Sequence, residues 1–500
     1  MAVLAIIQKL IYLIYFVILV FVCLRIIFDT QDTSKALAYI LFAIFVPIVG
    51  IAFYFTVGIN YRKRKLYTKK LKHEEKLKGF SYGDESWTIA NKKIFDDIGL
   101  KNYKPLAKLL SNSHVGTITV NNDVELLING EEKFKSVFEA IREAKNHIHI
   151  EYFIVEDDYV GNQLAELLIQ KASEGVEVRF IYDDYGSRGI RKRYAQRLAQ
   201  NGVDIHPFYK IKLLLLANRL NYRNHRKIIV VDGKIGFVGG INVSDRYINY
   251  TDEQIDKMGV YAKKNKKKKY WRDTHIKISG ESVYALQYVF LCDWNFCAKQ
   301  DLKANLKFFP KINKQYNNGK AVQMVAGGPD SELPLTELSI LRTINNAKTE
   351  ILITTPYFIP SKSVLEALYS AALSGVKIKL LVPKCSDTLI VDVAAKSYYN
   401  ELLRANAEIY LYIKGMIHAK TLVSDKELSI VGTANMDIRS FDLNFEINAM
   451  IYNKTFSEQL ADIFYKDLND AEKIDVVAWN KKPFYKKLWS KLLSLFSPLL

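Results

Sequence analysis

The chain has 500 residues, of which 49% are hydrophobic, and it carries a formal net charge of +18. A chain of this length and hydrophobic content can bury more than one core, so several domains are expected. Its four cysteines follow neither a disulfide nor a zinc spacing, which excludes a disulfide-held scaffold. The positive charge predicts a polyanionic partner, either nucleic acid or an anionic membrane.

Two apolar segments at the start of the chain predict a pair of transmembrane helices. Residues 36–58 are 23 residues without a charge, which at about 1.5 Å per residue can cross a hydrocarbon layer of about 30 Å. Residues 10–24 reach that length when extended at both ends, with Lys9 and Arg25 snorkelling. No small-residue cleavage site follows, which favours a span over a signal peptide. Pro47 predicts a kink in the second span.

The distribution of charge predicts the orientation of these spans. Basic residues follow the second span immediately, at Arg62, Lys63, Arg64, Lys65, Lys69, Lys70 and Lys72, whereas the charges of the loop between the spans cancel. The positive-inside rule then places both termini and the main body in the cytoplasm. With two spans and this cluster, anionic lipid is a simpler partner than nucleic acid. We assign a membrane hairpin to residues 1–58 and a basic linker and leader to residues 59–129.

Beyond the leader, an α/β pattern occurs twice. Each copy contains a strand-like run, a helical stretch and a second β-branched run, at 144–154, 161–174 and 176–180 in the first copy and at 347–359, 363–374 and 376–380 in the second. This β-α-β succession is typical of an α/β domain. The predicted boundaries are a first half at 130–300, a connector at 301–320, a second half at 321–474 and a basic amphipathic tail at 475–500.

The most informative feature is a motif, His-x-Lys-x-x-x-x-Asp, that is present in both halves. An asparagine follows each histidine at the same distance, 17 positions (225 to 242 and 418 to 435). The first copy consists of His225, Lys227, Asp232 and Asn242, and the second of His418, Lys420, Asp425 and Asn435. Because chance does not readily preserve four residue types at matched offsets, the duplication predicts a site built from two halves.

These residue types suit chemistry on a phosphodiester. An imidazole can attack phosphorus, while lysine ammonium groups and an amide stabilise charge on the phosphate oxygens. On a strand, positions i and i+2 share one face, so His225 and Lys227 are expected to point into one cavity. One histidine then acts as the nucleophile and the other as the general acid, and the motif alone leaves open which is which. Asp232 and Asp425 lie farther along the strand, where each orients a histidine or caps the following turn.

Metal ligands with suitable spacing accompany neither copy of the motif. We therefore expect no metal and no cofactor, with cationic side chains supplying the charge stabilisation that a metal would otherwise give.

On these motifs the chain resembles the phospholipase D superfamily and, within it, the bacterial cardiolipin synthases. The similar segments extend over nearly the whole chain and include Ile150–Phe153, Tyr222–Lys227, Gly239–Asn242, Trp271–Thr274, Asp293–Phe296, Thr355–Pro360, Gly432–Phe441, Asn444–Glu446 and Ser497–Leu500. The paired motif is specific to the superfamily, and the flanking segments are specific to the synthases.

The resemblance implies two α/β/α sandwich domains related by a pseudo-twofold axis, a shared active site and a phosphohistidine intermediate. It implies that the catalytic set is His225, Lys227, Asp232, His418, Lys420 and Asp425, with Asn242 and Asn435 binding phosphate. It further implies that Glu446 bonds to the histidine of the opposite half. The first half has Gly240 where many members of the superfamily have serine.

The leading hypothesis is a multi-pass enzyme of the bacterial cytoplasmic membrane that joins two phosphatidylglycerol molecules into cardiolipin and releases glycerol. A phospholipase D-type hydrolase or another phosphatidyltransferase is the alternative, because admitting water would turn the transfer into hydrolysis. A membrane-tethered nuclease is less favoured, since no nucleic-acid module is recognisable. Intact motifs argue against a non-catalytic scaffold. No oligomeric state is predicted.

Three further segments are not explained by the catalytic fold. Ile211–Leu216 is apolar, precedes His225 and is a candidate lip of the active site. Lys263–Lys269 is either a solubilising loop or a contact for lipid headgroups. The tail places Phe484, Leu488 and Leu492 on one side of a helix, which either lies at a membrane surface or docks on the catalytic body.

Overall fold

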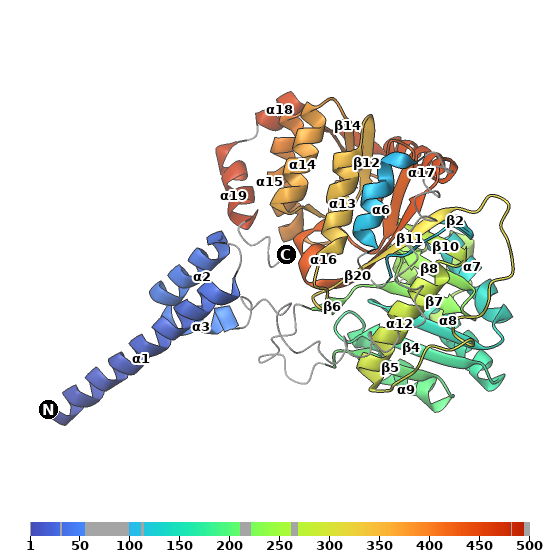
Figure 1. The fold of residues 1–500 in the computed structure, drawn as a ribbon, viewed down its shortest axis with the longest axis horizontal. Coiled ribbons are helices and arrows are strands. Elements are labelled where there is room, and N and C mark those ends of the chain that lie inside the picture. Colours follow the sequence, from blue (N-terminus) through green and yellow to red (C-terminus); the bar gives the residue numbers. More distant parts are fainter. Residues whose placement is uncertain are drawn as a thin grey trace. The chain divides into compact units, whose positions relative to one another are not determined.

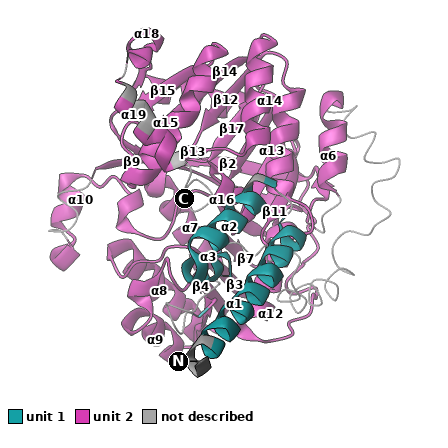
Figure 2. Cartoon of the chain, turned by 90° about the vertical axis from the view of Figure 1, so that its left-hand side faces the viewer, with its two compact units in different colours: residues 1–69, 210–222 teal, residues 70–209, 223–500 magenta. Residues whose placement is uncertain are grey.

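The computed structural model describes residues 2–30, 33–55, 100–111, 115–210, 222–261, 269–481 and 483–494. The chain divides into two compact units, residues 1–69 with 210–222 and residues 70–209 with 223–500 (Figure 2). Several segments singled out in the sequence lie outside the described residues, namely the basic cluster at 62–72, the candidate lip at 211–216, most of the lysine run at 263–269 and the closing residues 497–500.

In the described part of the first unit, three helices pack together, α1 (Ala2–Asp29), α2 (Thr33–Phe45) and α3 (Pro47–Phe53). Within α1, residues 6–29 are long and apolar enough to span a membrane, as expected for the extended first segment. The second segment is interrupted at Pro47, where the predicted kink is confirmed, because proline has no N–H to continue the helix but suits its first turn. Among the described residues, α1 is thus the one candidate span.

In the second unit, the first half is built on a seven-stranded sheet with the order β2-β10-β8-β7-β3-β4-β5. The strands are β2 (Asn122–Ile128), β3 (His147–Tyr152), β4 (Glu177–Asp183), β5 (Asp204–Phe208), β7 (Lys227–Val231), β8 (Ile235–Gly239) and β10 (Thr274–Gly280). β3, β4 and β5 are parallel, which requires crossover helices, and the other pairs are antiparallel. β7 is buried along its whole length, which explains its continuous apolar sequence.

The second half repeats this order in the path β11-β20-β18-β17-β12-β14-β15. These strands are β11 (Ala321–Gly327), β12 (Glu350–Thr354), β14 (Lys377–Pro383), β15 (Glu408–Tyr412), β17 (Thr421–Ser424), β18 (Leu428–Gly432) and β20 (Asn444–Tyr452), with β1 (Ile118–Thr119) and β21 (Ala471–Lys473) added at the two edges. The predicted twofold use of one α/β pattern is confirmed by this shared topology.

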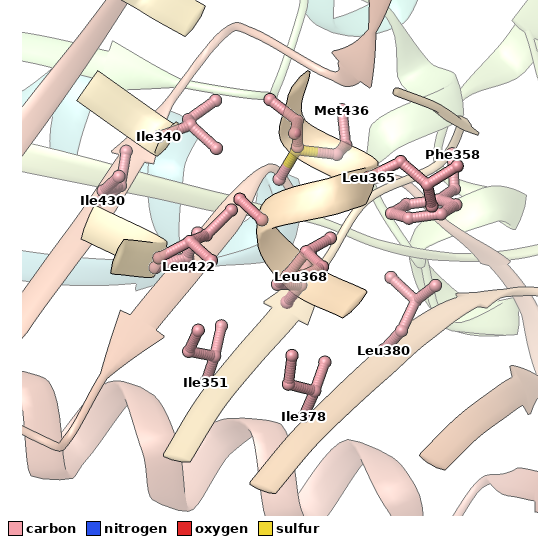
Figure 3. Close-up of a cluster of buried hydrophobic side chains, with 14 of the residues drawn as sticks. Ile340, Ile351, Phe358, Leu365, Leu368, Ile378, Leu380, Leu422, Ile430 and Met436 are labelled. Carbon is pink, nitrogen blue, oxygen red and sulfur yellow. The ribbon is translucent and has the colours of Figure 1, made fainter. Parts of the chain in front are cut away.

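Helices cover both faces of each sheet (Figure 1). In the first half, α7 (Asn129–Glu143) and α8 (Tyr159–Ser173) share a hydrophobic core with the strands, while α12 (Val283–Ala298) lies on the other face and α9 (Arg193–Gln200) connects β4 to β5. In the second half, the core includes α6 (Lys104–Leu110), α13 (Leu335–Asn346), α14 (Lys362–Leu373) and α15 (Leu389–Arg404), and α17 (Lys454–Leu468) covers the other face. Figure 3 shows part of this second core. Each half is therefore an α/β/α sandwich.

The described part of this unit also contains smaller elements. They are the strand pair β13 (Phe358–Ile359) and β19 (Met436–Asp437), the helices α10 (Asp252–Asp256), α16 (Ile438–Asp442), α18 (Val476–Asn480) and α19 (Phe484–Ser494), and the 3-10 helices η6 (Lys101–Tyr103), η7 (Arg188–Ile190), η9 (Asp245–Tyr247) and η10 (Gly259–Tyr261). Residues 299–320 contain neither helix nor strand. α19 packs along α15, so the tail docks on the catalytic body.

Candidate active site

Two short parallel strand pairs join the halves and position the two motif histidines. β6 (Arg223–Asn224) pairs with β20, and β16 (Gly415–Ile417) pairs with β9 (Tyr270–Arg272). At the end of each pair, the backbone N–H of His225 donates to the Phe445 carbonyl (3.0 Å), and that of His418 donates to the Arg272 carbonyl (2.7 Å). Each histidine is thus fixed to the backbone of the opposite half, and the two half-sites form a single site.

Each histidine side chain also contacts a carboxylate from the opposite half. Nδ1 of His225 lies 2.9 Å from Oε1 of Glu446, the contact implied for this glutamate. Nδ1 of His418 lies 2.7 Å from Oδ2 of Asp273, a residue that the sequence analysis did not place in the site. Because a carboxylate only accepts hydrogen bonds, Nδ1 carries the proton in both rings and Nε2 keeps its lone pair.

Strand register shows that these two carboxylates are equivalent. In the first half, Gly239 pairs with His275, and Asp273 comes two residues before His275. In the second half, the equivalent Gly432 pairs with Asn448, and Glu446 comes two residues before Asn448. Sequence spacing hides this relation, because Asp273 follows its motif asparagine by 31 positions (242 to 273) and Glu446 by 11 (435 to 446). One sequence signal could have identified Asp273. In each half, an acidic residue stands near the start of the strand that pairs with the segment Gly239-Gly240 or Gly432-Thr433.

The motif lysines lie beside their histidines, as the i and i+2 spacing predicts. Nζ of Lys227 donates to the carbonyl oxygen of His225 (2.7 Å). Nζ of Lys420 lies 2.9 Å from Nδ1 and 3.1 Å from Nε2 of His418 and also donates to its carbonyl oxygen (2.5 Å). Two cationic groups are therefore held within the site, next to the imidazoles.

Burial controls the protonation of these groups. His225 and His418 are 8% and 7% exposed, and desolvation lowers the pKa of His225 to about 4 and also lowers that of His418. Burial likewise lowers the pKa of Lys227 to about 7 and of Lys420 to about 8. Burial alone would raise the pKa of Glu446, but His225 and Lys227 lower it overall. At neutral pH the imidazoles are uncharged and the carboxylate is ionised.

The two motif asparagines are buried and bonded to protein groups. Oδ1 of Asn242 accepts from the Ile154 N–H (3.2 Å), and its Nδ2 donates to the Tyr247 hydroxyl (2.5 Å), whose ring packs 5.7 Å from that of His418. Nδ2 of Asn435 donates to Asp437 (3.0 Å). The contact with Tyr247 places Asn242 near His418, and phosphate binding by both asparagines stays a prediction.

Asp232 and Asp425 lie away from the histidines, at the far ends of β7 and β17. The Asp232 carboxylate accepts from the backbone N–H groups of residues 145–147, at 2.7–2.9 Å. The Asp425 carboxylate accepts from those of residues 348–350, at 2.8–3.0 Å. Of the two roles considered for them, capping a turn describes this geometry, because each secures the loop that precedes β3 or β12.

A buried network of charged residues lies under the site, and the sequence motifs do not indicate it. Arg226 forms an ion pair with Asp293 and donates through Nε to the carbonyl oxygen of Glu446 (3.3 Å). Asn224 donates to Glu151, whose pKa is raised well above its usual value by burial and by neighbouring Asp293. Because Asn224 and Arg226 are both bonded to buried carboxylates, the network orients His225, which lies between them. Among the described residues, no cluster of three or more His, Cys, Asp or Glu is arranged to hold a metal ion.

A family model described as "Cardiolipin synthase, PLD-like domain" matches residues 137–265 and 340–468, and another, "Phospholipase_D-nuclease N-terminal", matches residues 16–58. The chain belongs to the cardiolipin synthase family of the phospholipase D superfamily. It is a membrane-associated phosphatidyltransferase of that superfamily, and its N-terminal helix α1 is apolar.

The relatives match over almost the full length. A cardiolipin synthase of Geobacillus sp. (strain WCH70) is 38% identical over 96% of this chain and 92% of its own. The "Major cardiolipin synthase ClsA" of Bacillus subtilis (strain 168) is 37% identical over 97% of this chain and 98% of its own. The crystal structure of phosphatidylserine synthase from Haemophilus influenzae Rd KW20 covers 79% of this chain and 97% of its own with a TM-score of 0.55; at 15% identity it supports the fold alone.

Proposed function

We propose that this protein transfers a phosphatidyl group from one phosphatidylglycerol to the hydroxyl of another, giving cardiolipin and glycerol. The observation that carries the proposal is the pair of histidines in one site, each bonded to a carboxylate of the opposite half. Such a pair supplies a nucleophile and a general acid to one phosphodiester.

In the first step, the Nε2 lone pair of one neutral histidine attacks phosphorus and the bond from phosphorus to the glycerol oxygen breaks. The second histidine, protonated once the anionic substrate is bound, gives its Nε2 proton to the departing oxygen. In the second step, the hydroxyl of another phosphatidylglycerol returns a proton to that histidine and attacks phosphorus, and the phosphorus–nitrogen bond breaks. Lys227 and Lys420 stabilise the charge on the non-bridging oxygens.

The carboxylates have a defined task in this scheme. Glu446 and Asp273 hold the Nδ1 proton, so that Nε2 faces phosphorus, and they stabilise the imidazolium that forms during transfer. Low exposure of both histidines favours transfer over hydrolysis, because water has little access to the phosphohistidine. A phospholipase D-type hydrolase remains the second candidate on the same residues.

The membrane arrangement belongs to the same proposal. α1 forms the first span, and α2 with α3 forms a second span kinked at Pro47, with both termini in the cytoplasm. A reporter fused after Leu500 should read cytoplasmic, and a tag between Asp29 and Ser34 should be labelled from outside. The opposite labelling pattern would reject this orientation. The division into a hairpin, a leader, two catalytic halves, a connector and a tail, at the boundaries given above, is proposed with it.

The central experiment is turnover by the purified full chain. In vesicles of phosphatidylglycerol we expect cardiolipin and glycerol in equal amounts, with activity that persists in excess EDTA. Phosphatidic acid as the main product would identify a hydrolase, and loss of activity on chelation with recovery on adding a divalent ion would overturn the metal-free mechanism. Degradation of DNA in a parallel assay would support the nuclease alternative.

A further inference from the structure

The loop after β14, together with the first turn of α15, lies at the edge of the second sheet where the active site is found. Thr354, the last residue of β12, is opposite Leu381 of β14 on one side and Thr421 of β17 on the other. Lys420 immediately precedes Thr421. Neighbouring strands are about 4.8 Å apart, so β14 leaves the sheet roughly 10 Å from β17, the strand that begins directly after Lys420. Residues 384–390 therefore begin beside the catalytic centre.

A side-chain contact ties this loop to the rim of the site. The Tyr357 hydroxyl donates to Oδ1 of Asp387 (2.6 Å). Asp387 is also close enough to Lys420 and Tyr247 to influence their titration. Because the Tyr247 ring packs on His418, Asp387 stands at the border of the catalytic pocket. The two residues that follow Thr388 are then part of the rim.

Those two residues are apolar and exposed. Leu389 is 80% exposed and Ile390 is 49% exposed, whereas Val391, the next residue, is buried in the second core. Ile413, which directly follows β15, is also 49% exposed. It lies next to this loop, because the carbonyl of the preceding Tyr412 accepts a hydrogen bond from the N–H of Lys384. Exposed apolar side chains that gather beside a binding site mark a contact surface rather than ordinary surface scatter.

α19 packs on α15 (Figure 1), the helix that begins with Leu389 and Ile390, and carries further exposed apolar residues. Its Leu493 contacts the second core. Tyr485, Trp489 and Leu492 remain exposed on α19. Aromatic rings of this kind are favoured at the boundary between headgroups and acyl chains. The docked tail therefore presents an outward apolar face instead of burying all its hydrophobic residues.

The first half gives an internal comparison. The loop after β4 is topologically equivalent to the loop after β14, and there Ile190 is completely buried while Arg188 and Arg191 lie beside it. That loop exposes one aromatic residue, Tyr185 (46%), but no aliphatic pair, so the exposed pair Leu389 and Ile390 is not a general requirement of the fold at this edge. It is specific to the second half.

We propose that Leu389 and Ile390, continued by Ile413 and the exposed face of α19, insert into the headgroup boundary of the phospholipid bilayer and bring the active site to its substrate. The proposal rests on the proposed function, since a diacyl substrate keeps its chains in the bilayer while its phosphate must reach His225 and His418. A bilayer can cover an apolar surface next to this pocket and still let a lipid molecule enter the pocket. A second protein copy on the same surface would instead cover the rim.

The first test compares two forms of the substrate. Leu389→Asp combined with Ile390→Asp in the full chain should lower synthesis at least tenfold on phosphatidylglycerol vesicles and by less than twofold on short-chain phosphatidylglycerol in detergent. The matched control is Leu373→Asp, because Leu373 is 60% exposed at the end of α14 that faces away from the site. This control should retain activity on both substrates. Equal loss on both substrates in the double variant would overturn the proposal.

The second test does not depend on activity. A cysteine at Leu389, with Cys23 and Cys385 replaced by serine, would carry an environment-sensitive fluorophore, and vesicles would contain lipids with a nitroxide on the acyl chain. Quenching at 389 but not in the matched Leu373→Cys protein supports insertion. Absence of quenching, or a signal that depends on protein concentration rather than on nitroxide lipid, overturns it and indicates a protein partner. If quenching occurs without any synthesis, the proposed function fails while the membrane contact stands.

Discussion

The two halves share a strand order and a motif, but they support their catalytic groups differently. Glu446, which serves His225, also accepts a hydrogen bond from the Thr433 hydroxyl. Gly240 occupies the equivalent position in the other half, where a Cβ would lie 2.2 Å from Oδ1 of Asp273. Asp273 accepts instead from the Thr274 N–H (2.7 Å). The departure from serine at Gly240 therefore makes room for the partner of His418.

The space behind the lysines differs as well. In the first half Tyr152 lies opposite Lys227, and buried Lys133 and His275 lie close by. In the second half, the space behind Lys420 contains a cavity of about 20 Å³, roughly the size of one water molecule. The residues that line it include Thr354, Thr355, Lys420 and Asn448. The duplicated fold thus fixes the reacting groups, while neighbouring side chains make the two environments unequal. We expect the two histidines to have distinct roles for this reason.

Removing either histidine is the strongest way to test the single shared site. His225→Ala and His418→Ala should each lower turnover by more than about 10⁴-fold, because nucleophile and general acid act as a unit. After acid quenching of a reaction with labelled lipid, the adduct should be on one histidine only. We expect His225, since Lys420 lies against Nε2 of His418 while Lys227 bonds to backbone. Near-normal turnover by either variant would refute the shared site.

The carboxylates test whether the two supports are equivalent. Glu446→Gln and Asp273→Asn keep the shape but remove the negative charge that stabilises the imidazolium, and the new NH2 group can donate to Nδ1 and so favour the wrong tautomer. Each should lower kcat by about 10²–10⁴-fold, the range of comparable histidine partners. Thr433→Val should cost about tenfold, because it removes one hydrogen bond to Glu446 and leaves the carboxylate in place. Unchanged kcat in Asp273→Asn would remove this residue from the mechanism.

The lysines make the comparison dependent on pH. Burial lowers the pKa of Lys227 to about 7 and of Lys420 to about 8, so the free enzyme loses positive charge as pH rises through this interval. kcat/KM, which reports on the free enzyme, should therefore fall on the alkaline side. Arginine keeps its charge, so Lys227→Arg should move the start of this decline from about 7 towards about 8, the pKa of Lys420. An unmoved alkaline limb would show that Lys227 does not control it.

The smallest expected effect concerns Lys133, which is buried in the first half. Burial lowers its pKa well below the usual value, and its amine has no hydrogen-bond partner among the described residues. The unfolded chain therefore binds this proton more tightly, and stability should rise with pH up to about 10.4, the pKa of a free lysine. Lys133→Met should raise the midpoint of thermal unfolding at pH 7 by a few degrees, with the gain disappearing towards pH 10.

Lys135→Met is the matched control for this measurement, because Lys135 is exposed on the same helix. It should leave the midpoint unchanged at both pH values. A lower midpoint for Lys133→Met at pH 7 would instead show that the buried amine stabilises the first half.

The sequence by itself determined the features that depend on local pattern. Strand and helix periodicity predicted both β-α-β units, a proline without an N–H predicted the interruption at Pro47, and matched offsets predicted the paired motif. The terminal helix was also recognisable from its apolar spacing. These features arise from neighbours along the chain, whose geometry is set by the period of the element.

Only the tertiary structure decided which distant groups meet. Asp273 reaches His418 across 145 positions and Arg226 pairs with Asp293 across 67, and neither contact has a periodic signal. The structure also directed Asp232 and Asp425 to the loops before β3 and β12 instead of to the histidines. Such contacts depend on strand register and on the association of the two halves. Local propensity does not encode either of them, because both follow from how complete sheets pack.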